Sequence, residues 1–360
     1  MPTKRKGIKG IKISQEPVWK GPEEDGITQS LLGLFLVCRE RFRLRTIEGL
    51  SAPPEFNHSI EYGNMWHECE EAHAEGKDWK KPLKDYCAQL CMKYKTQQQQ
   101  IQKWFEVCKI QFPVYVEYWK HHKDMKKRTP LLQEEVFKVP HLLPSGRTVN
   151  LKGKWDSVDI VGTGKSRRVW LQENKTKGDI KDHLIERQLS FDIQTGIYLT
   201  SLAEGKTLPA KLEGVRYNVV RRPLSGGKGS IRQHKPTKKN PEGESAEHYY
   251  GRLKDIIDED PGHFFMRWNV EVSAQDLDKF KTHFLDPVLE QLCDWWEWIM
   301  IDPFDPWRVD FEGRYYGIHW RHPYGVYNPL NEGRSTNLDE YLKTGNELGL
   351  VRTTNLFPEL

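Results

Sequence analysis

Two carboxylates and a lysine stand in a spacing that could hold a divalent metal ion beside a phosphate group. Asp156 follows the sequence Gly-Lys-Trp, and Glu173 and Lys175 flank the middle residue of Gln172–Thr176. We expect Asp156 in one strand of a hairpin, and Glu173 and Lys175 at the end of the next strand. Since residues i and i+2 of a strand share a face, Glu173 and Lys175 should point the same way, at the end of the sheet where Asp156 converges with them.

These residue types predict metal-dependent hydrolysis of a phosphodiester bond. Mg²⁺ or Mn²⁺ neutralises phosphate charge and activates water, and such hard cations take a few carboxylates together with carbonyls and water. Asp156, Glu173 and the main-chain carbonyl of Asn174 would supply this ligand set. Lys175 can orient the attacking water or stabilise the charge that grows on the phosphate. A solvated hairpin with a surface Glu–Lys pair is the alternative that so short a motif leaves open.

The elements that must position these side chains form an α/β pattern. Three short runs with a period of two, Gln133–Val139, Thr148–Val161 and Arg168–Gln172, predict an antiparallel meander. A helical pattern over Ile180–Ala203 and a strand over Gly214–Val220 follow. A strand, a crossover helix and a further strand predict an α/β core.

Helical patterns flank this core on both sides. Ile60–Trp119 predicts a helical bundle or arm, and Ser273–Met300 predicts a long helix. We therefore expect four regions: a mobile basic arm at 1–26, a helical region at 27–125 that packs on the core, the core at 126–300 with a basic loop at 221–244, and a C-terminal segment at 301–360 that wraps the surface.

The composition excludes a membrane span and leaves the charge of the partner open. The chain has 360 residues with 13 Trp, 14 Tyr and 14 Phe, and its formal net charge of +4 allows basic patches without proving a polyanionic partner. Its longest apolar run, Leu31–Cys38, is shorter than the roughly 20 residues of a membrane helix. The six cysteines make no CxxC pair, so we expect reduced thiols and a cytoplasmic protein.

A basic loop leaves the last predicted strand of the core. It is interspersed with Gly and Pro and carries no acidic residue before Glu242. Such a segment can track a nucleic-acid backbone, and solvated charge is the alternative. The residues expected to contact phosphates are Arg221, Arg222, Lys228, Arg232, Lys235, Lys238 and Lys239.

The ordered set of motifs resembles the PD-(D/E)XK nuclease superfamily, and within it the RecB-like exonuclease branch. Gly63–His67 corresponds to that family's Gly…His motif on an early helix. Gly153–Asp156, Glu173–Thr176 and Gln194–Tyr198 match, in order, its Gly-x-x-Asp strand, the (Asp/Glu)-x-Lys-Thr of its next strand end and its Gln-x-x-x-Tyr helix. Gly178 follows Thr176 after one residue, where the family pattern has two. The resemblance covers Thr28–Val220. It implies a restriction-endonuclease-like core, a central mixed sheet flanked by helices, with an N-terminal helical region and an extended C-terminal segment.

The resemblance also assigns further site residues. It places His67 near the metal. The alternative is that His67 is a histidine packed in the core. Gln194 and Tyr198 lie one helical turn apart and can reach the lysine or the phosphate backbone, unless they form a buried polar pair. They join the two carboxylates and the lysine as candidate catalytic residues. Of the adjacent acids Glu134 and Glu135, we keep Glu135 as a weak candidate for an additional ligand or supporting group.

The implied function is a divalent-metal-dependent DNA nuclease, an exonuclease of the kind used in recombination and repair and encoded by phages. DNA is the implied partner, and a recombination protein of unknown identity is a possible second partner. A structure-selective endonuclease and a DNA-binding protein with a decayed site are the alternatives. Several RecB-like relatives hold an iron–sulphur cluster; Cys38 matches its first cysteine, but Tyr315–Leu330 contains none, so we expect no cluster.

Overall fold

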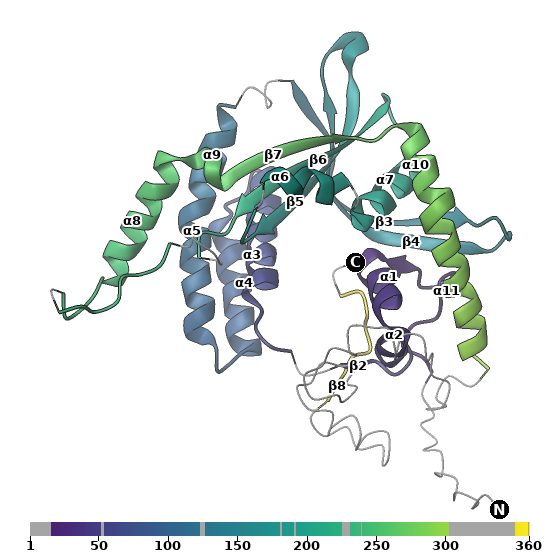
Figure 1. The fold of residues 1–360 in the computed structure, drawn as a ribbon, viewed down its shortest axis with the longest axis horizontal. Helices are drawn as coiled ribbons and strands as arrows, with labels where there is room; N and C mark the ends of the chain where they lie inside the picture. The colour runs from purple at the N-terminus through teal and green to yellow at the C-terminus, as the bar shows by residue number, and fades with distance from the viewer. Residues whose placement is uncertain are drawn as a thin grey trace, which may run out of the picture. The chain divides into compact units, whose positions relative to one another are not determined.

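The computed structural model describes residues 16–51, 54–122, 127–180, 182–190, 192–224, 231–238, 240–301, 350–358 and 360 (Figure 1). The chain divides into two compact units. The first comprises Met1–Pro54, Val136–Gly153 and Asp278–Leu360, and the second comprises Glu55–Glu135 and Lys154–Leu277. Most of the predicted arm at 1–26 and of the predicted segment at 301–360 lies outside the described residues, and the four-region division stays a prediction.

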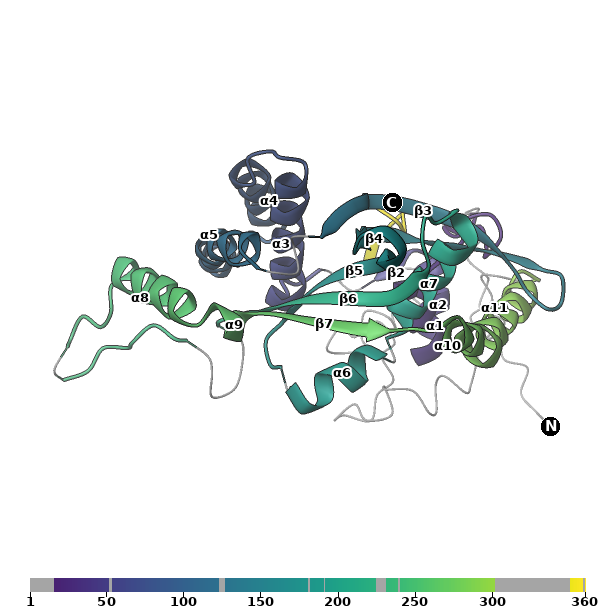
Figure 2. The same cartoon turned by 90° about the horizontal axis from the view of Figure 1, so that it is seen from above.

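The second unit is built on a mixed sheet, as the sequence predicted. Its strands are β3 (Arg128–Leu142), β4 (Thr148–Val161), β5 (Arg168–Lys177), β6 (Leu212–Arg221) and β7 (Phe265–Glu271), of which β3 and β4 begin or end in the first unit. β3 pairs with β4, and β4, β5, β6 and β7 follow one another across the sheet (Figure 2). The pairs β4–β5 and β6–β7 are antiparallel, and β5–β6 is parallel.

A helical crossover joins the parallel strands β5 and β6, since a tight turn cannot connect parallel neighbours. It consists of α6 (Asp182–Ser190) and α7 (Ile193–Gly205). The Asp192 side chain caps α7 by accepting a hydrogen bond from the Gln194 amide. This cap fixes where the helix begins, and therefore the face of the helix on which Gln194 lies.

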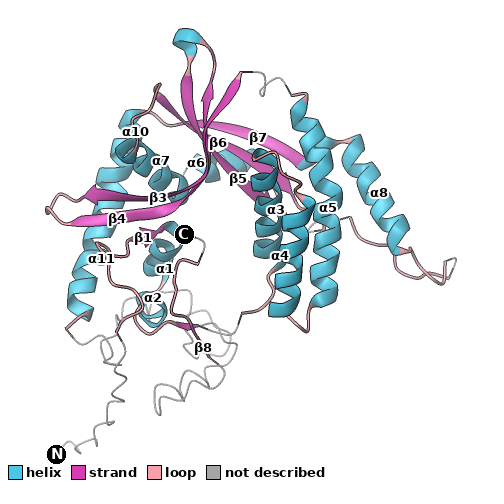
Figure 3. Cartoon of the chain, turned by 180° about the vertical axis from the view of Figure 1, so that it is seen from behind, coloured by secondary structure: helices cyan, strands magenta, loops and turns pink. Residues whose placement is uncertain are grey.

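Three helices of the second unit stand side by side (Figures 1 and 3): α3 (His58–Ala74), α4 (Lys80–Lys93) and α5 (Gln98–Lys120). Their shared core contains the fully buried rings of Tyr62, Trp66 and Phe112. Full burial of a large apolar side chain contributes about 1.5–3 kcal/mol, so these rings hold α3 firmly. Glu61 adds a polar tie, because its carboxylate accepts hydrogen bonds from two tyrosine hydroxyls, each at 2.7 Å.

Four further elements belong to the second unit. They are the 3₁₀ turn η2 (Gly164–Ser166), α8 (Ala246–Glu259), α9 (Pro261–Phe264) and the first part of α10 (Ala274–Phe280). The strand β7 forms an edge of the sheet. The predicted helix at 273–300 corresponds to α10, the π-helical turn η3 (Lys281–Leu285) and α11 (Asp286–Ile299).

The first unit contains mostly short elements. They are β1 (Ile27–Thr28), α1 (Gln29–Val37), α2 (Arg39–Thr46), β2 (Leu50–Ser51), η3, α11 and β8 (Val351–Arg352). β1 runs parallel to the start of β4, and a buried ion pair joins Arg43 to Glu48 at 2.5 Å. Cys38 separates α1 from α2, and its Sγ accepts a hydrogen bond from the Arg41 amide. None of the helices in the described part of the chain combines the length and the apolarity that a membrane crossing requires.

Candidate metal centre and nuclease site

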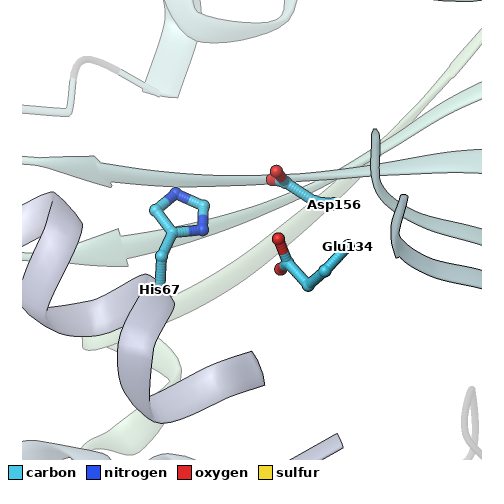
Figure 4. Close-up of side chains that lie close together, drawn as sticks. All are labelled: His67, Glu134 and Asp156. Atoms are coloured by element: carbon cyan, nitrogen blue, oxygen red, sulfur yellow. The ribbon is translucent and has the colours of Figure 1, made fainter. Parts of the chain in front are cut away.

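Three side chains of the second unit that could hold a metal ion lie close together (Figure 4). His67 comes from α3, Glu134 from β3 and Asp156 from β4. One ligand atom of each lies within 4.8 Å of the others, and all three residues are half-buried. His67 and Asp156 were both predicted to lie at a metal site, and the structure brings their side chains together.

Glu134, and not Glu135, completes this group. Glu135 forms an ion pair with Lys206 at 2.5 Å. Glu134 has a φ of 46°, a left-handed conformation that residues other than glycine rarely adopt. Strained backbone of this kind concentrates at functional sites, where the surrounding structure stabilises it. The structure therefore brings Glu134 into the group, and a supporting role for Glu135 stays a prediction.

A second cluster lies at the end of β5 and includes the predicted Glu173, Lys175 and Gln194. Lys175 Nζ donates to Glu173 Oε1 at 2.8 Å and to Gln194 Oε1 at 2.7 Å. Gln194 Nε2 in turn donates to Glu173 Oε1 at 2.6 Å. The three side chains form a closed ring of hydrogen bonds, which holds the lysine ammonium in one position.

Asn174 links the two clusters through its backbone. Its N–H donates to Asp156 Oδ2 at 2.7 Å, so the middle residue of the Glu-x-Lys motif orients the aspartate. Its expected role as a carbonyl ligand stays a prediction. Glu173 does not belong to the group of three ligand atoms, although the charge of Asp156 acts on it.

Burial of the carboxyl groups at the site disfavours their negatively charged forms. Burial raises the pKa of Asp156 to about 7, and the charge of Glu134 adds to this rise. Burial also raises the pKa of Glu173 to about 7, with Asp156 as the second cause. Burial lowers the pKa of His67, which favours the neutral imidazole that binds metals.

The donor set fits a divalent cation. Glu173 is only 2% exposed, and its Oε2 is buried without a hydrogen-bond partner among the described residues. A buried carboxylate oxygen without a donor is costly, and a cation would satisfy it. Carboxylate oxygens suit Mg²⁺ and Mn²⁺, and an imidazole nitrogen is a common ligand of transition metals.

Tyr198, the last predicted member, lies one turn beyond Gln194 on α7. It is 9% exposed, and burial raises the pKa of its hydroxyl, as do the charges of Glu173 and Asp156. Its backbone carbonyl accepts a hydrogen bond from Trp155 Nε1 at 3.2 Å. Tyr198 therefore ties α7 to the strand that carries Asp156.

Sequence reasoning missed two charged residues next to the site. Lys154 lies two positions before Asp156 and pairs with Glu134 at 2.8 Å and with Glu71 at 3.2 Å. Glu70 lies one helical turn after His67 and accepts a hydrogen bond from the Tyr115 hydroxyl at 2.7 Å. Burial raises the pKa of Glu70 to about 8. A helical period applied to α3 could have indicated Glu70, since it shares a face with His67.

The predicted basic loop divides into buried, exposed and undescribed parts. Arg222 is 9% exposed and donates to the Ser59 carbonyl at 3.0 Å, so it belongs to the interior. Arg221 lies in β6 and donates to the His263 carbonyl at 3.0 Å. The exposed members are Arg232, Lys235 and Lys238. Lys228 and Lys239 lie outside the described residues.

The mixed sheet carries these carboxylates and the lysine on β3, β4 and β5, and the flanking helix α3 supplies the histidine. Residues 27–293 match the PD-(D/E)XK nuclease superfamily, and the chain belongs to this superfamily. Comparison with curated proteins returns no match. Members of this superfamily use divalent metals, which agrees with the donor set described above.

The raised pKa values predict how the metal-free protein responds to pH. An acid whose pKa is higher in the folded state binds protons more tightly there, so folding stability is lost as pH rises from the unfolded pKa near 4 through the folded pKa near 7. Each pKa unit corresponds to about 1.4 kcal/mol. In EDTA, the melting temperature should therefore fall between pH 5 and pH 8.

The matched variant removes the charges responsible for this loss. Asp156→Asn combined with Glu173→Gln should show a smaller fall in melting temperature and a higher melting temperature than the unmodified chain at pH 8. Differential scanning fluorimetry across this pH range measures both. An equal fall in the two proteins would contradict the assigned electrostatics.

Proposed function

We propose that this protein is a divalent-metal-dependent deoxyribonuclease that acts as an exonuclease in DNA recombination or repair. The observation that carries the proposal is the convergence of His67, Glu134 and Asp156 next to the hydrogen-bonded ring of Glu173, Lys175 and Gln194. DNA, the exonuclease activity and the RecB-like branch rest on the order of the sequence motifs.

In this proposal the residues of the site have different roles in hydrolysis. His67, Glu134, Asp156 and Glu173 would hold the cation, which when bound neutralises phosphate charge and makes water more acidic. An ammonium group has three N–H donors, and Glu173 and Gln194 use two of those on Lys175. The third can donate to a phosphate oxygen or to the attacking water. Gln194 acts as a positioning residue, because its amide fixes both the acceptor and the lysine.

The experiment that tests the proposal compares DNA substrates with and without free ends. Linear duplex, single-stranded and covalently closed circular DNA are incubated with Mg²⁺, with Mn²⁺ or with EDTA, and the products are separated on gels. We expect release of mononucleotides or short oligonucleotides from linear DNA, only with a metal. Cleavage of closed circles would identify an endonuclease, and DNA binding without cleavage in either metal would identify a decayed site.

The exposed part of the basic loop gives a separate prediction about binding. Replacing Arg232, Lys235 and Lys238 by Gln should reduce the salt dependence of DNA affinity, because each phosphate neutralised adds about 0.9 to the slope of log affinity against log salt concentration. Fluorescence anisotropy of labelled duplex in EDTA measures this slope. Substituting Lys254, which is paired with Asp258 on α8, provides the control. An unchanged slope in the triple variant would mean that these side chains are solvated and do not contact the DNA phosphates.

A further inference from the structure

A row of polar side chains crosses the sheet on the face of β5 opposite to Glu173 and Lys175. Successive residues of a strand point to opposite faces, so Asn174 points away from its two neighbours. In the register of the sheet, Asn174 lies opposite Asn218 of β6, and Asn218 lies opposite Arg267 of β7. Residues in register share a face, so these three side chains form a line across three strands.

Hydrogen bonds connect the line from end to end. Arg267 Nε donates to Asn218 Oδ1 at 2.6 Å, and Asn218 Nδ2 donates to Asn174 Oδ1 at 3.0 Å. The Arg267 guanidinium lies over the ring of Trp119 on α5, 3.8 Å from its centre. A cation at this distance from an aromatic face is attracted to it, which fixes the far end of the line.

Because the two asparagine side chains of this line are buried, they depend on their hydrogen-bond partners within the protein. Asn218 is 2% exposed and Asn174 is 8% exposed. A buried amide that loses its hydrogen-bond partner destabilises the fold, whereas apolar side chains at the same positions would need no partner. Fully bonded polar networks select a single arrangement of the groups they contain.

This hydrogen-bonded line is connected to the proposed metal ligands through Asn174. Asn174 is the member of the line on β5, where its Oδ1 also accepts a hydrogen bond from Gln172 Nε2 at 3.4 Å. Its backbone N–H donates to Asp156 Oδ2 at 2.7 Å. The same residue lies between Glu173 and Lys175 in the strand. A shift or rotation of the Asn174 peptide would therefore move the aspartate and both flanking side chains.

We propose that Asn218 and Arg267 are positioning residues of the metal centre: they hold Asn174 from the opposite face of the sheet, and through its N–H they fix Asp156 in the geometry that binds a divalent cation. This inference rests on the proposed function, since it assumes that Asp156 is a metal ligand. It assigns a role in metal affinity to two residues that touch neither the cation nor the substrate.

The test measures Mn²⁺ binding to the full chain without DNA, by electron paramagnetic resonance of the free ion. Groups that orient metal ligands affect affinity by 10–100-fold, so Asn218→Leu and Arg267→Leu should each raise the Mn²⁺ dissociation constant roughly tenfold. Arg267→Lys keeps the charge over Trp119 and should restore part of the affinity. Asn269→Leu is the matched control, because Asn269 lies on the same face of β7 but bonds to Arg216 at 3.1 Å.

The outcomes separate this inference from the proposed function. Circular dichroism and the melting temperature establish that each variant is folded, and should Asn218→Leu fail to fold, the two Arg267 variants on the edge strand decide. Unchanged Mn²⁺ affinity in folded variants would overturn the inference while leaving the nuclease assignment intact. If the unmodified chain binds Mn²⁺ but cleaves no DNA, the proposed function fails, and weaker Mn²⁺ binding by the folded Asn218 and Arg267 variants would still support the positioning role. Absence of Mn²⁺ binding by the unmodified chain would overturn both.

Discussion

Asp156→Asn and Glu173→Gln should each reduce DNA cleavage by more than about a thousandfold. Both changes remove a negative charge while keeping the shape of the side chain, so the site loses a carboxylate ligand without a cavity. A bound metal ion contributes several kcal/mol to phosphodiester hydrolysis, and each 1.4 kcal/mol corresponds to a factor of ten in rate. Initial rates on end-labelled linear DNA at saturating Mg²⁺ measure the loss.

The control for these variants is Glu135→Gln, because Glu135 neighbours Glu134 in β3 but pairs with Lys206 away from the group. This variant should retain cleavage close to that of the unmodified chain. DNA affinity in EDTA should change little in any of the three. Near-normal cleavage by either of the first two variants would mean that the site lies elsewhere.

Lys175→Gln should lower kcat by about a hundredfold and leave metal binding intact. Removing one group that stabilises charge in a transition state typically lowers kcat by about 10²–10³. The side chain contacts Glu173 and Gln194, and its loss removes a positive charge from beside the carboxylates. Mn²⁺ should therefore bind as tightly as before or more tightly, whereas KM for DNA should change little.

Lys177→Gln serves as the control because Lys177 lies two residues further along the same face of β5. A folded Lys175→Gln variant that loses Mn²⁺ binding together with cleavage would assign the lysine to the structure of the metal centre. A variant with unchanged kcat would remove it from the reaction. Only a loss of kcat with retained metal affinity supports the proposed role.

The sequence was most informative where chemistry and local structure depend on neighbouring residues. The spacing of Glu173 and Lys175 predicts a shared face, and the two side chains are in contact. The helical spacing of Gln194 and Tyr198 predicts one helix, and both lie on α7, whose N-cap is Asp192. The mixed sheet was predicted because the pattern of a strand, a helix and a strand permits a parallel pair.

Other features depend on contacts between distant parts of the chain. Alternation along β3 implies that only one of Glu134 and Glu135 faces the site, but the positive φ of Glu134 cannot be read from a strand pattern. Arg222 belongs to a run of basic residues, and only the fold shows that it is buried against Ser59. The salt bridges of Lys154 are equally invisible, because they join α3 and β3 to β4.

The double ion pair of Lys154 also bears on how permanently a cation would be held. Lys154 already balances part of the negative charge of Glu134, so an incoming cation would share this carboxylate with the lysine and loosen their contact. The binding free energy of the cation is reduced by the energy of the contact it weakens. A divalent cation bound there should therefore exchange readily: dialysis should remove it, and its occupancy should follow the free concentration of that cation in the surrounding solution.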